Sequence, residues 1–196
     1  MAEILAKQIR ERIKAQGANT LYMVSDFADL NNDGVVARTL SRLEKESVLV
    51  RISQGIYLYP RRNHFGILRP SIDEISVAIA QKDKARIIPS GLTALNKLGL
   101  STQVTMNAVY LTDATAREIR IGNRTITVKR SAPRNFAYKT DLFPLIVSAL
   151  KEIGSANVTD EHIARIQETI ARCEDKEAVR HDYGLLPGWI KNRLSV

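Results

Sequence analysis

Hydrophobic residues near the N-terminus recur at helical spacing. Ile9 and Ile13 lie four residues apart among Lys, Arg, Glu and Gln, a pattern that predicts a helix over residues 2–16. A shorter helix is predicted over residues 26–30, because Ser25 can cap its first turn. We therefore expect two helices ahead of a polar turn that is rich in Asn and Asp.

A third helix is predicted over residues 35–46. At 100° per residue, Val36, Leu40 and Leu43 fall on one narrow stripe that should face the protein core. Both glutamates of this helix project to its flanks, so we expect a cationic outer face without an acidic group. That face carries Arg38, Ser41, Arg42 and Lys45.

A β-hairpin is predicted directly after the third helix. Residues 48–52 and 56–59 are β-branched or aromatic and roughly alternate, and Ser53-Gln54-Gly55 between them suits a short turn. Pro60 should end the second strand, because it cannot donate a ladder hydrogen bond. A helix-turn-helix followed by such a hairpin is typical of the winged helix-turn-helix, whose second helix enters a DNA major groove.

The rest of the chain predicts further helices and strands. Ser71 and Glu74 have the spacing of a capping box, and Gly122-Asn123 should turn a basic hairpin over residues 117–130. From residue 141 the pattern is helical. We therefore predict an α+β fold, with an N-terminal winged helix-turn-helix, a mixed α+β domain and a helical C-terminus. The expected domains are a DNA-binding domain at 1–62, a linker at 63–70, and a dimerisation or partner-binding domain at 71–196.

Composition favours a polyanion-binding protein. The 196 residues carry a net charge of +8, and the Lys and Arg excess lies in the first 140 residues, whereas the last 56 are slightly acidic. The single cysteine, Cys173, excludes a disulfide within the chain and suits a reducing cytoplasm. The N-terminus lacks an apolar signal segment, and no run is long enough to span a membrane. We expect a cytoplasmic protein without a membrane partner.

Residues 35–60 resemble the N-terminal winged-helix domain of AbiEi-type antitoxins, which belong to bacterial type IV toxin–antitoxin systems. The resemblance lies in an R-x-L-x-R-L helix that begins at Arg38 and a Gly-Ile-Tyr wing that begins at Gly55. Ser47 departs from the pattern, because a helix-ending Gly is commoner there. Residues 71–113 resemble the second region of a small antitoxin-like bacterial family. The resemblance implies repression of the protein's own operon and neutralisation of a nucleotidyltransferase-like toxin.

Double-stranded DNA of the protein's own promoter is the expected ligand. Regulators of this type usually bind as two-fold dimers on half-sites about one helical turn apart. We expect four residues to contact the DNA backbone: Lys45, Arg51, Arg61 and Arg62. Four others should reach base edges, Asn32, Arg38, Thr39 and Arg42, and Ser41 and Gln54 lie beside them on the helix and the wing tip.

Catalytic and metal-binding signals are weak. Residues 29–34 match the start of a calcium-binding EF-hand loop, but Leu40 stands where the loop needs a bidentate Glu. Asp113 and Glu118 faintly resemble a restriction-type nuclease cluster, but Arg120 stands where Lys is usual. We therefore expect no metal, no cofactor and no enzymatic activity.

Two alternatives stay open at the level of the sequence. The winged helix could dock a protein partner instead of DNA. The basic hairpin at 117–130 could be a solvated edge sheet protected by its charges, or a second nucleic-acid surface.

Overall fold

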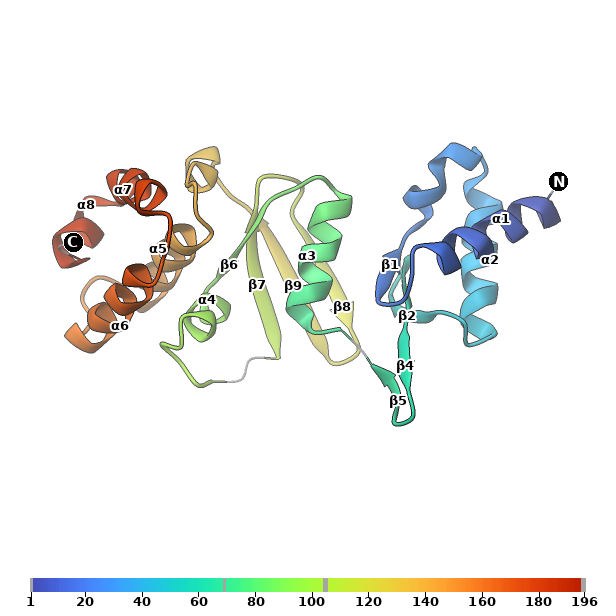
Figure 1. Ribbon diagram of the computed structural model, residues 1–196, viewed down its shortest axis with the longest axis horizontal. Helices are drawn as coiled ribbons and strands as arrows, with labels where there is room; N and C mark the ends of the chain where they lie inside the picture. The colour runs from blue at the N-terminus through green and yellow to red at the C-terminus, as the bar shows by residue number, and fades with distance from the viewer. Residues whose placement is uncertain (1, 69, 104–105, 195–196) are drawn as a thin grey trace. The chain divides into compact units, whose positions relative to one another are not determined.

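The computed structural model describes residues 2–68, 70–103 and 106–194 and shows a mixed α+β protein (Figure 1). Contacts within the chain divide it into two units, each with a hydrophobic core of its own. Residues 1–79 and 120–122 form the first unit, and residues 80–119 and 123–196 form the second unit.

The first unit begins with helices and short strands in the predicted order. Strands β1, β3 and β2 form an antiparallel sheet with β3 in the centre. A helix-turn-helix closed by the β2–β3 hairpin is a winged helix-turn-helix, as predicted. In chain order the elements are α1 (Ala2–Ala15), β1 (Thr20–Tyr22), the 3-10 helix η1 (Val24–Leu30), α2 (Asp33–Lys45), β2 (Val50–Ser53), β3 (Ile56–Tyr59), β4 (Arg61–Asn63) and β5 (Gly66–Leu68).

The core of the first unit joins α1, α2, η1 and the sheet. Ile9 and Ile13 of α1 and Leu40 of α2 are fully buried. Tyr22 of β1 stacks on Phe27 of η1, with ring centroids 6.0 Å apart. The Tyr22 hydroxyl donates to the Ile13 carbonyl at 3.2 Å, and burial raises the pKa of Tyr22 to about 12. The predicted apolar stripe of α2 is therefore the face that packs into the core.

Helix α2 ends at a residue in the left-handed backbone region. Ser47 has φ 57°. Its N–H donates to the Glu44 carbonyl and the Val48 N–H donates to the Leu43 carbonyl, both at 2.9 Å. This pair of hydrogen bonds is a Schellman motif, in which the left-handed position favours Gly. The residue that departs from the antitoxin pattern therefore occupies the position where Gly would be least strained.

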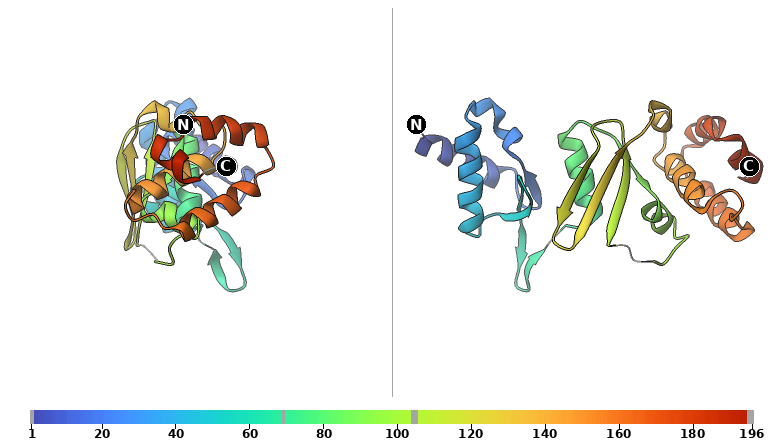
Figure 2. Two further views of the ribbon diagram at one scale, coloured as in Figure 1. Left: turned by 90° about the vertical axis from the view of Figure 1, so that its left-hand side faces the viewer. Right: turned by 180° about the vertical axis from the view of Figure 1, so that it is seen from behind.

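Two hairpins follow α2, and they differ in burial. In the first, β2 and β3 turn at Gly55, which has φ 74°, and Ile52, Ile56 and Leu58 are buried. In the second, β4 pairs antiparallel with β5, and every residue from 61 to 68 is exposed. The segment expected to be a linker is thus a hairpin over most of its length, which extends away from the helices of its unit (Figure 2). Arg69 lies outside the described residues.

The remaining elements build a sheet and a helical C-terminus. The capping box ahead of α3 is confirmed, because the Ser71 N–H donates to Glu74 Oε2 at 2.7 Å and the Glu74 N–H donates to Ser71 Oγ at 3.1 Å. The elements are α3 (Ile72–Lys82), β6 (Ile87–Ser90), α4 (Leu92–Lys97), β7 (Asn107–Thr112), β8 (Arg117–Ile121), β9 (Arg124–Arg130), the 3-10 helix η2 (Pro133–Phe136), α5 (Leu142–Ile153), α6 (Asp160–Ala171), α7 (Lys176–Leu185) and α8 (Gly188–Leu194).

The four-stranded sheet is mixed, with strand order β6-β7-β9-β8. Strand β7 pairs antiparallel with β6 and parallel with β9, and Gly122 turns the predicted β8–β9 hairpin at φ 59°. Strand β6 runs through Pro89 to Ser90, with Pro89 opposite Tyr110. Proline is tolerated there because β6 is an edge strand.

One helix start differs from the prediction. Helix η1 begins one residue before Ser25, and Asp26 Oδ2 accepts the Met23 N–H at 2.7 Å. Ser25 therefore lies inside the helix instead of capping its first turn. Helix α4 follows Gly91, and Ser90 is the last residue of β6.

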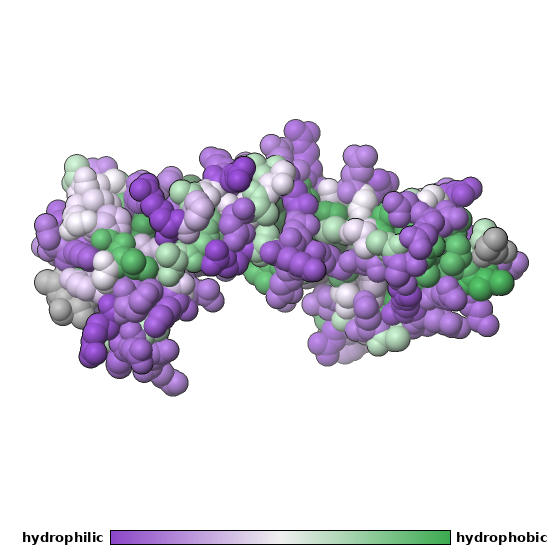
Figure 3. Space-filling model, turned by 90° about the horizontal axis from the view of Figure 1, so that it is seen from above, coloured by the Kyte–Doolittle hydropathy of each residue, from purple (hydrophilic) through white to green (hydrophobic). Residues whose placement is uncertain are grey.

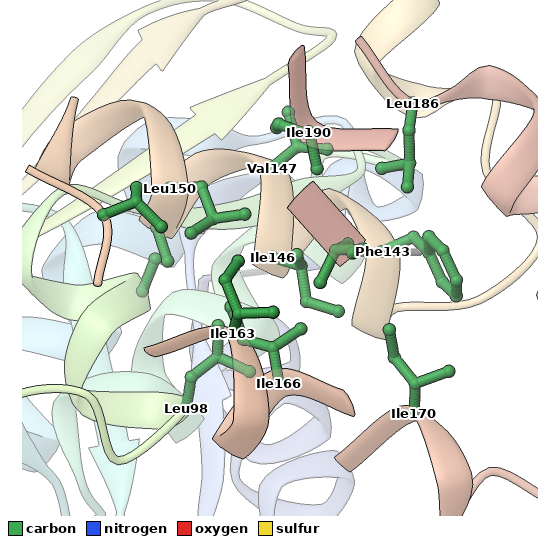
Figure 4. Packing of buried hydrophobic residues seen from close by; sticks show 14 of the residues in the cluster. Leu98, Phe143, Ile146, Val147, Leu150, Ile163, Ile166, Ile170, Leu186 and Ile190 are labelled. Carbon is green, nitrogen blue, oxygen red and sulfur yellow. The ribbon is translucent and has the colours of Figure 1, made fainter. Parts of the chain in front are cut away.

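The C-terminal helices share one hydrophobic core. Figure 4 shows side chains from α5, α6 and α8 that converge on it, together with Leu98 directly after α4 and Leu186 directly after α7. Phe143, Ile146 and Ile190 are fully buried, and Trp189 packs against the cluster at its edge. The helical periodicity from residue 141 onward therefore corresponds to a real packing face.

A buried carboxylate ties α7 to the chain ahead of α5. Asp182 is fully buried, and it accepts hydrogen bonds at 2.8 Å from the Lys139 N–H, the Thr140 N–H and the Thr140 hydroxyl. His181 Nδ1 lies 2.9 Å from the same carboxylate. Burial opposes the ionisation of Asp182, but these hydrogen bonds outweigh it and hold its pKa below the usual range. The His181-Asp182 pair is therefore part of a structural link between α7 and the chain ahead of α5.

Candidate nucleic-acid interface

Charge, rather than apolar surface, marks the candidate site. On the face shown in Figure 3, hydrophilic residues predominate and hydrophobic residues form separate small patches. The clearest cationic feature of the first unit is the outer face of α2.

The outer face of α2 lies opposite its buried stripe. Val36, Leu40 and Leu43 are at most 1% exposed, whereas Arg38 and Lys45 are exposed and Ser41 is half-buried. The sequence placed these three polar residues correctly on the outer face. It missed two small residues beside them, Gly34 and Ala37, which are also exposed. The same 100° projection that found the cations could have found both.

The side chain of Arg38 lies back along its own helix. Its Nε donates to the Gly34 carbonyl at 3.0 Å, which holds the guanidinium near the N-terminal turn of α2. Asn32 caps this turn, because its Oδ1 accepts the Val35 N–H at 3.1 Å. Asn32 was expected at base edges, and its oxygen is engaged in the cap here. The N-terminal end of α2 therefore has an ordered polar arrangement.

Arg42 lies at the edge of the outer face, where an acidic group reaches it. Arg42 Nε is 3.7 Å from Glu46 Oε1, and Arg10 of α1 binds Glu46 Oε2 at 2.8 Å. The expectation of an acid-free face therefore needs correction at this edge, because the last turn of α2 brings Glu46 back to Arg42. All three side chains are substantially exposed, so these ion pairs contribute little to stability.

Thr39 does not reach the surface. Its side chain is 4% exposed, and it lines a hollow with Val35 and with Ala2 and Ala6 of α1. Thr39 was expected to contact base edges, but α1 covers it, because the N-terminal turns of α1 pass beside this part of α2. We therefore leave Thr39 out of the candidate interface.

The wing supplies two exposed polar residues. Arg51 of β2 is exposed and lies opposite Tyr57 of β3, and Gln54 is exposed in the turn. Both positions agree with the prediction that the wing tip carries polar groups outward. The buried neighbours Ile52 and Ile56 fix the wing to the core.

Arg61 and Arg62 belong to β4, and one of them makes a contact that the sequence did not reveal. The Arg62 guanidinium donates to the Ser47 carbonyl at the end of α2. Carbonyl groups at a helix C-terminus carry partial negative charge, which favours a cation there. Arg62 therefore holds the second hairpin beside the end of α2, while Arg61 is exposed.

Two cations near the four-stranded sheet of the second unit are engaged in internal contacts. Arg86 binds Asp113 through its N–H at 2.8 Å and its Nε at 2.9 Å, and the Arg117 guanidinium binds Asp83. The hydrogen bond from the Arg86 N–H, with that from its side chain, holds the pKa of Asp113 below the usual range. The carboxylate that faintly suggested a nuclease therefore serves as an acceptor for Arg86.

Neither metal-site geometry nor a membrane-spanning helix is found in the described part of the chain. Among residues 2–68, 70–103 and 106–194, no three His, Cys, Asp or Glu side chains gather closely enough to hold a metal ion. None of the helices in those ranges is both long and apolar enough to cross a membrane.

Comparison with known proteins places the chain in a family. The model of a family of unknown function, DUF6088, matches residues 8–179, so the chain belongs to this family. No curated protein matches the chain. The matched range includes both the winged helix-turn-helix and most of the second unit.

Proposed function

We propose that this member of the DUF6088 family is a DNA-binding transcriptional regulator that represses its own promoter. The observation that carries the proposal is the outer face of α2, which presents Arg38, Ser41 and Lys45 in a winged helix-turn-helix. In this fold the second helix of the helix-turn-helix is the element that enters the major groove. A cationic outer face is what a groove lined by phosphates attracts.

The residues divide into two roles. Lys45 and Arg51 would contact phosphates, which fix the register of the protein on the duplex without reading sequence. Arg38 and Arg42 would read base edges, because a guanidinium can bind guanine O6 and N7 in a bidentate manner. The small side chain at Ala37 lets the helix approach the bases closely.

The ion pair at the edge of the face is compatible with DNA binding. Arg42 and Glu46 are both exposed, and an exposed pair at 3.7 Å is worth little in water. A phosphate or a guanine can therefore replace Glu46 as the partner of Arg42 at small cost. Glu46 would then stay bound to Arg10, at 2.8 Å.

The second unit would bind a protein partner of the regulator. The resemblance to AbiEi-type antitoxins supports a role as the antitoxin of a bacterial toxin–antitoxin operon, acting in the cytoplasm by binding rather than by catalysis. In that role the second unit would neutralise a nucleotidyltransferase-like toxin or join two copies of the chain. A two-fold dimer would bind half-sites about one helical turn apart.

A gel shift on duplex DNA from upstream of the protein's own gene tests the proposal. Arg38→Ala and Arg42→Ala should each weaken binding by roughly 1–3 kcal/mol. Lys14→Ala is the matched control, because it removes one exposed cation from α1 of the same unit. Raising the salt concentration should weaken wild-type binding steeply, since phosphate contacts release counterions.

The rival function is a winged helix that docks a protein. If both arginine variants bind the upstream duplex as tightly as wild type and the Lys14 control, the recognition role of α2 is wrong. If wild type binds no duplex but retains a protein partner that Arg38→Ala loses, the docking function replaces the DNA-binding one.

A further inference from the structure

The β4–β5 hairpin exposes side chains that soluble proteins usually cover. Phe65 at its turn is 88% exposed, and Ile67 and Leu68 of β5 are 40% and 46% exposed. A two-stranded hairpin without a buried face is only marginally stable in water. Apolar exposure of this kind marks an interaction site more often than a structural one.

The turn holds its aromatic group in a defined position. Asn63 Oδ1 accepts the Phe65 N–H at 2.9 Å, which is an Asx turn closed by the side chain. The His64 and Phe65 rings lie 4.0 Å apart between centroids, with a 46° angle between planes. The turn therefore presents two neighbouring rings to solvent instead of folding them back on the strands.

A hydrogen bond joins the hairpin to the end of α2. The Arg62 guanidinium donates to the Ser47 carbonyl, directly after the last turn of α2. Because this contact lies at the end of α2 and both elements belong to the same unit, a ligand that extends past the end of α2 can reach the hairpin as well. Duplex DNA that holds α2 in its major groove is such a ligand.

The charge of the hairpin indicates which ligand it fits. Residues 61–68 contain two arginines and one histidine and no acidic residue. An apolar protein surface would be complementary to Ile67 and Phe65 but not to Arg61. Nucleic acid satisfies both, because phosphates pair with cations and base steps accept an aromatic ring.

We infer that the β4–β5 hairpin is a second DNA-binding element, in which Phe65 wedges between base pairs from the minor groove while Arg61 contacts the backbone. The inference rests on the proposed function, because the same duplex would contact both α2 and the hairpin. Apolar wedges of this kind unstack a base step partly and kink the duplex toward the major groove. The protein therefore bends its operator.

A bending assay on the full chain tests the inference. The probe is a duplex of about 40 base pairs from upstream of the gene, which is long enough to contain a bent site. It carries a donor dye at one end and an acceptor dye at the other. Wild type should raise energy transfer. Phe65→Ala should abolish the rise and weaken binding at least about fivefold, whereas Phe65→Leu, which keeps an apolar wedge, should restore part of both.

The matched control is Ile4→Ala, which removes another exposed apolar side chain, 63% exposed, from α1 of the same unit. It should bind and bend DNA as wild type does. Thermal unfolding of Phe65→Ala should match wild type, because the side chain packs so little. A lower unfolding temperature would show a structural role for Phe65 and would overturn the inference.

The possible results of these assays distinguish a failure of the inference from a failure of the proposed function. If Phe65→Ala binds and bends DNA like wild type while Arg38→Ala loses affinity, the wedge is wrong and the regulator stands. If wild type binds no duplex, both are wrong. If Phe65→Ala lowers the molecular mass in solution, the hairpin joins two copies of the chain, and the wedge is again wrong.

Discussion

The two units of this protein use charged residues in different ways. In the first unit the buried cluster consists of hydrophobic and tyrosine side chains, and Arg38 and Lys45 lie on the surface opposite to it. In the second unit a carboxylate, Asp182, is fully buried and hydrogen-bonded to two neighbouring residues at 2.8 Å. A buried charge therefore holds segments of the second unit together, whereas Arg38 and Lys45 of the first unit are exposed and Arg10 pairs with Glu46 at the surface.

This difference separates the two basic regions of the chain. The sequence left open whether the basic β8–β9 hairpin is a solvated edge sheet or a second nucleic-acid surface. The Arg117 guanidinium, however, binds Asp83, and Arg86 beside the sheet donates two hydrogen bonds to Asp113. Cations that already have carboxylate partners gain less from a phosphate. Net positive charge alone is therefore a poor guide to the binding surface.

A charge placed in the hydrophobic core of the first unit should unfold that unit. Leu40→Asp puts a carboxylate at a fully buried position of α2, where nothing compensates the lost hydration. We expect it to cost more than about 4 kcal/mol and to unfold the first unit. Far-UV circular dichroism should lose helical signal, while fluorescence of Trp189, the only tryptophan, stays native because it lies in α8.

Ser41→Asp is the matched control for Leu40→Asp. The neighbouring side chain is on the outer face of α2 and half-buried, so the fold should be retained and DNA binding lost. If Trp189 fluorescence changes together with the helical signal in Leu40→Asp, the two units do not unfold separately, and their cores are not independent.

The buried charge of the second unit can be removed by substituting Asp182. Asp182→Ala leaves the partly buried N–H groups of Lys139 and Thr140 without their acceptor, and a fully buried donor left unsatisfied costs about 1–3 kcal/mol. Urea unfolding followed by Trp189 fluorescence should show a loss of roughly 2 kcal/mol or more, with DNA binding unchanged. A midpoint equal to that of wild type would contradict a structural role for Asp182.

The pKa of Asp182 adds a dependence on pH. Its pKa is lowered in the folded state, so the unfolded chain takes up the proton first as pH falls. The stabilisation is present in full above the ordinary aspartate pKa, near 4, and is lost as pH drops below it. Asp182→Asn, which cannot titrate, should therefore be much less stable than wild type at pH 7, with the gap closing toward pH 3. An equal gap at both values would contradict this linkage.

Sequence patterns predicted the elements well where burial follows a regular period. The α2 stripe, the wing turn at Gly55 and the capping box at Ser71 all follow from local rules, and each is present in the structure. The second hairpin was not foreseen. Its residues bury nothing, so they leave no alternation in the sequence, and Gly66 and Pro70 resemble linker punctuation.

The candidate site was predictable only as far as one helix determines it. A helical projection places Arg38 and Ser41 on the outer face without reference to other elements. It cannot show that α1 covers Thr39, that Glu46 returns to Arg42, or that Arg62 binds Ser47, because these contacts join elements distant in sequence or depend on side-chain conformation. Tertiary contacts therefore decide which predicted residues can reach a ligand.

The ends of α2 and α4 allow a smaller change in stability to be compared between the two units. Both helices end in a Schellman motif, with Ser47 at φ 57° in one and Gly99 at φ 66° in the other. A left-handed backbone costs a non-glycine residue roughly 1–2 kcal/mol, part of which the greater freedom of unfolded glycine offsets. Ser47→Gly should therefore stabilise the first unit by about 0.5 kcal/mol, and it keeps the carbonyl that Arg62 binds.

The reverse change, Gly99→Ser, should destabilise the second unit by more than Ser47→Gly stabilises the first. A Cβ at Gly99 would lie 3.3–3.5 Å from the Arg165 guanidinium, so that side chain must move in addition to the backbone strain. Hydrogen exchange of α2 measures the first effect, and Trp189 fluorescence during urea unfolding measures the second. If Ser47→Gly destabilises α2, the serine hydroxyl makes a favourable contact that outweighs the strain, and the two helix ends are not equivalent.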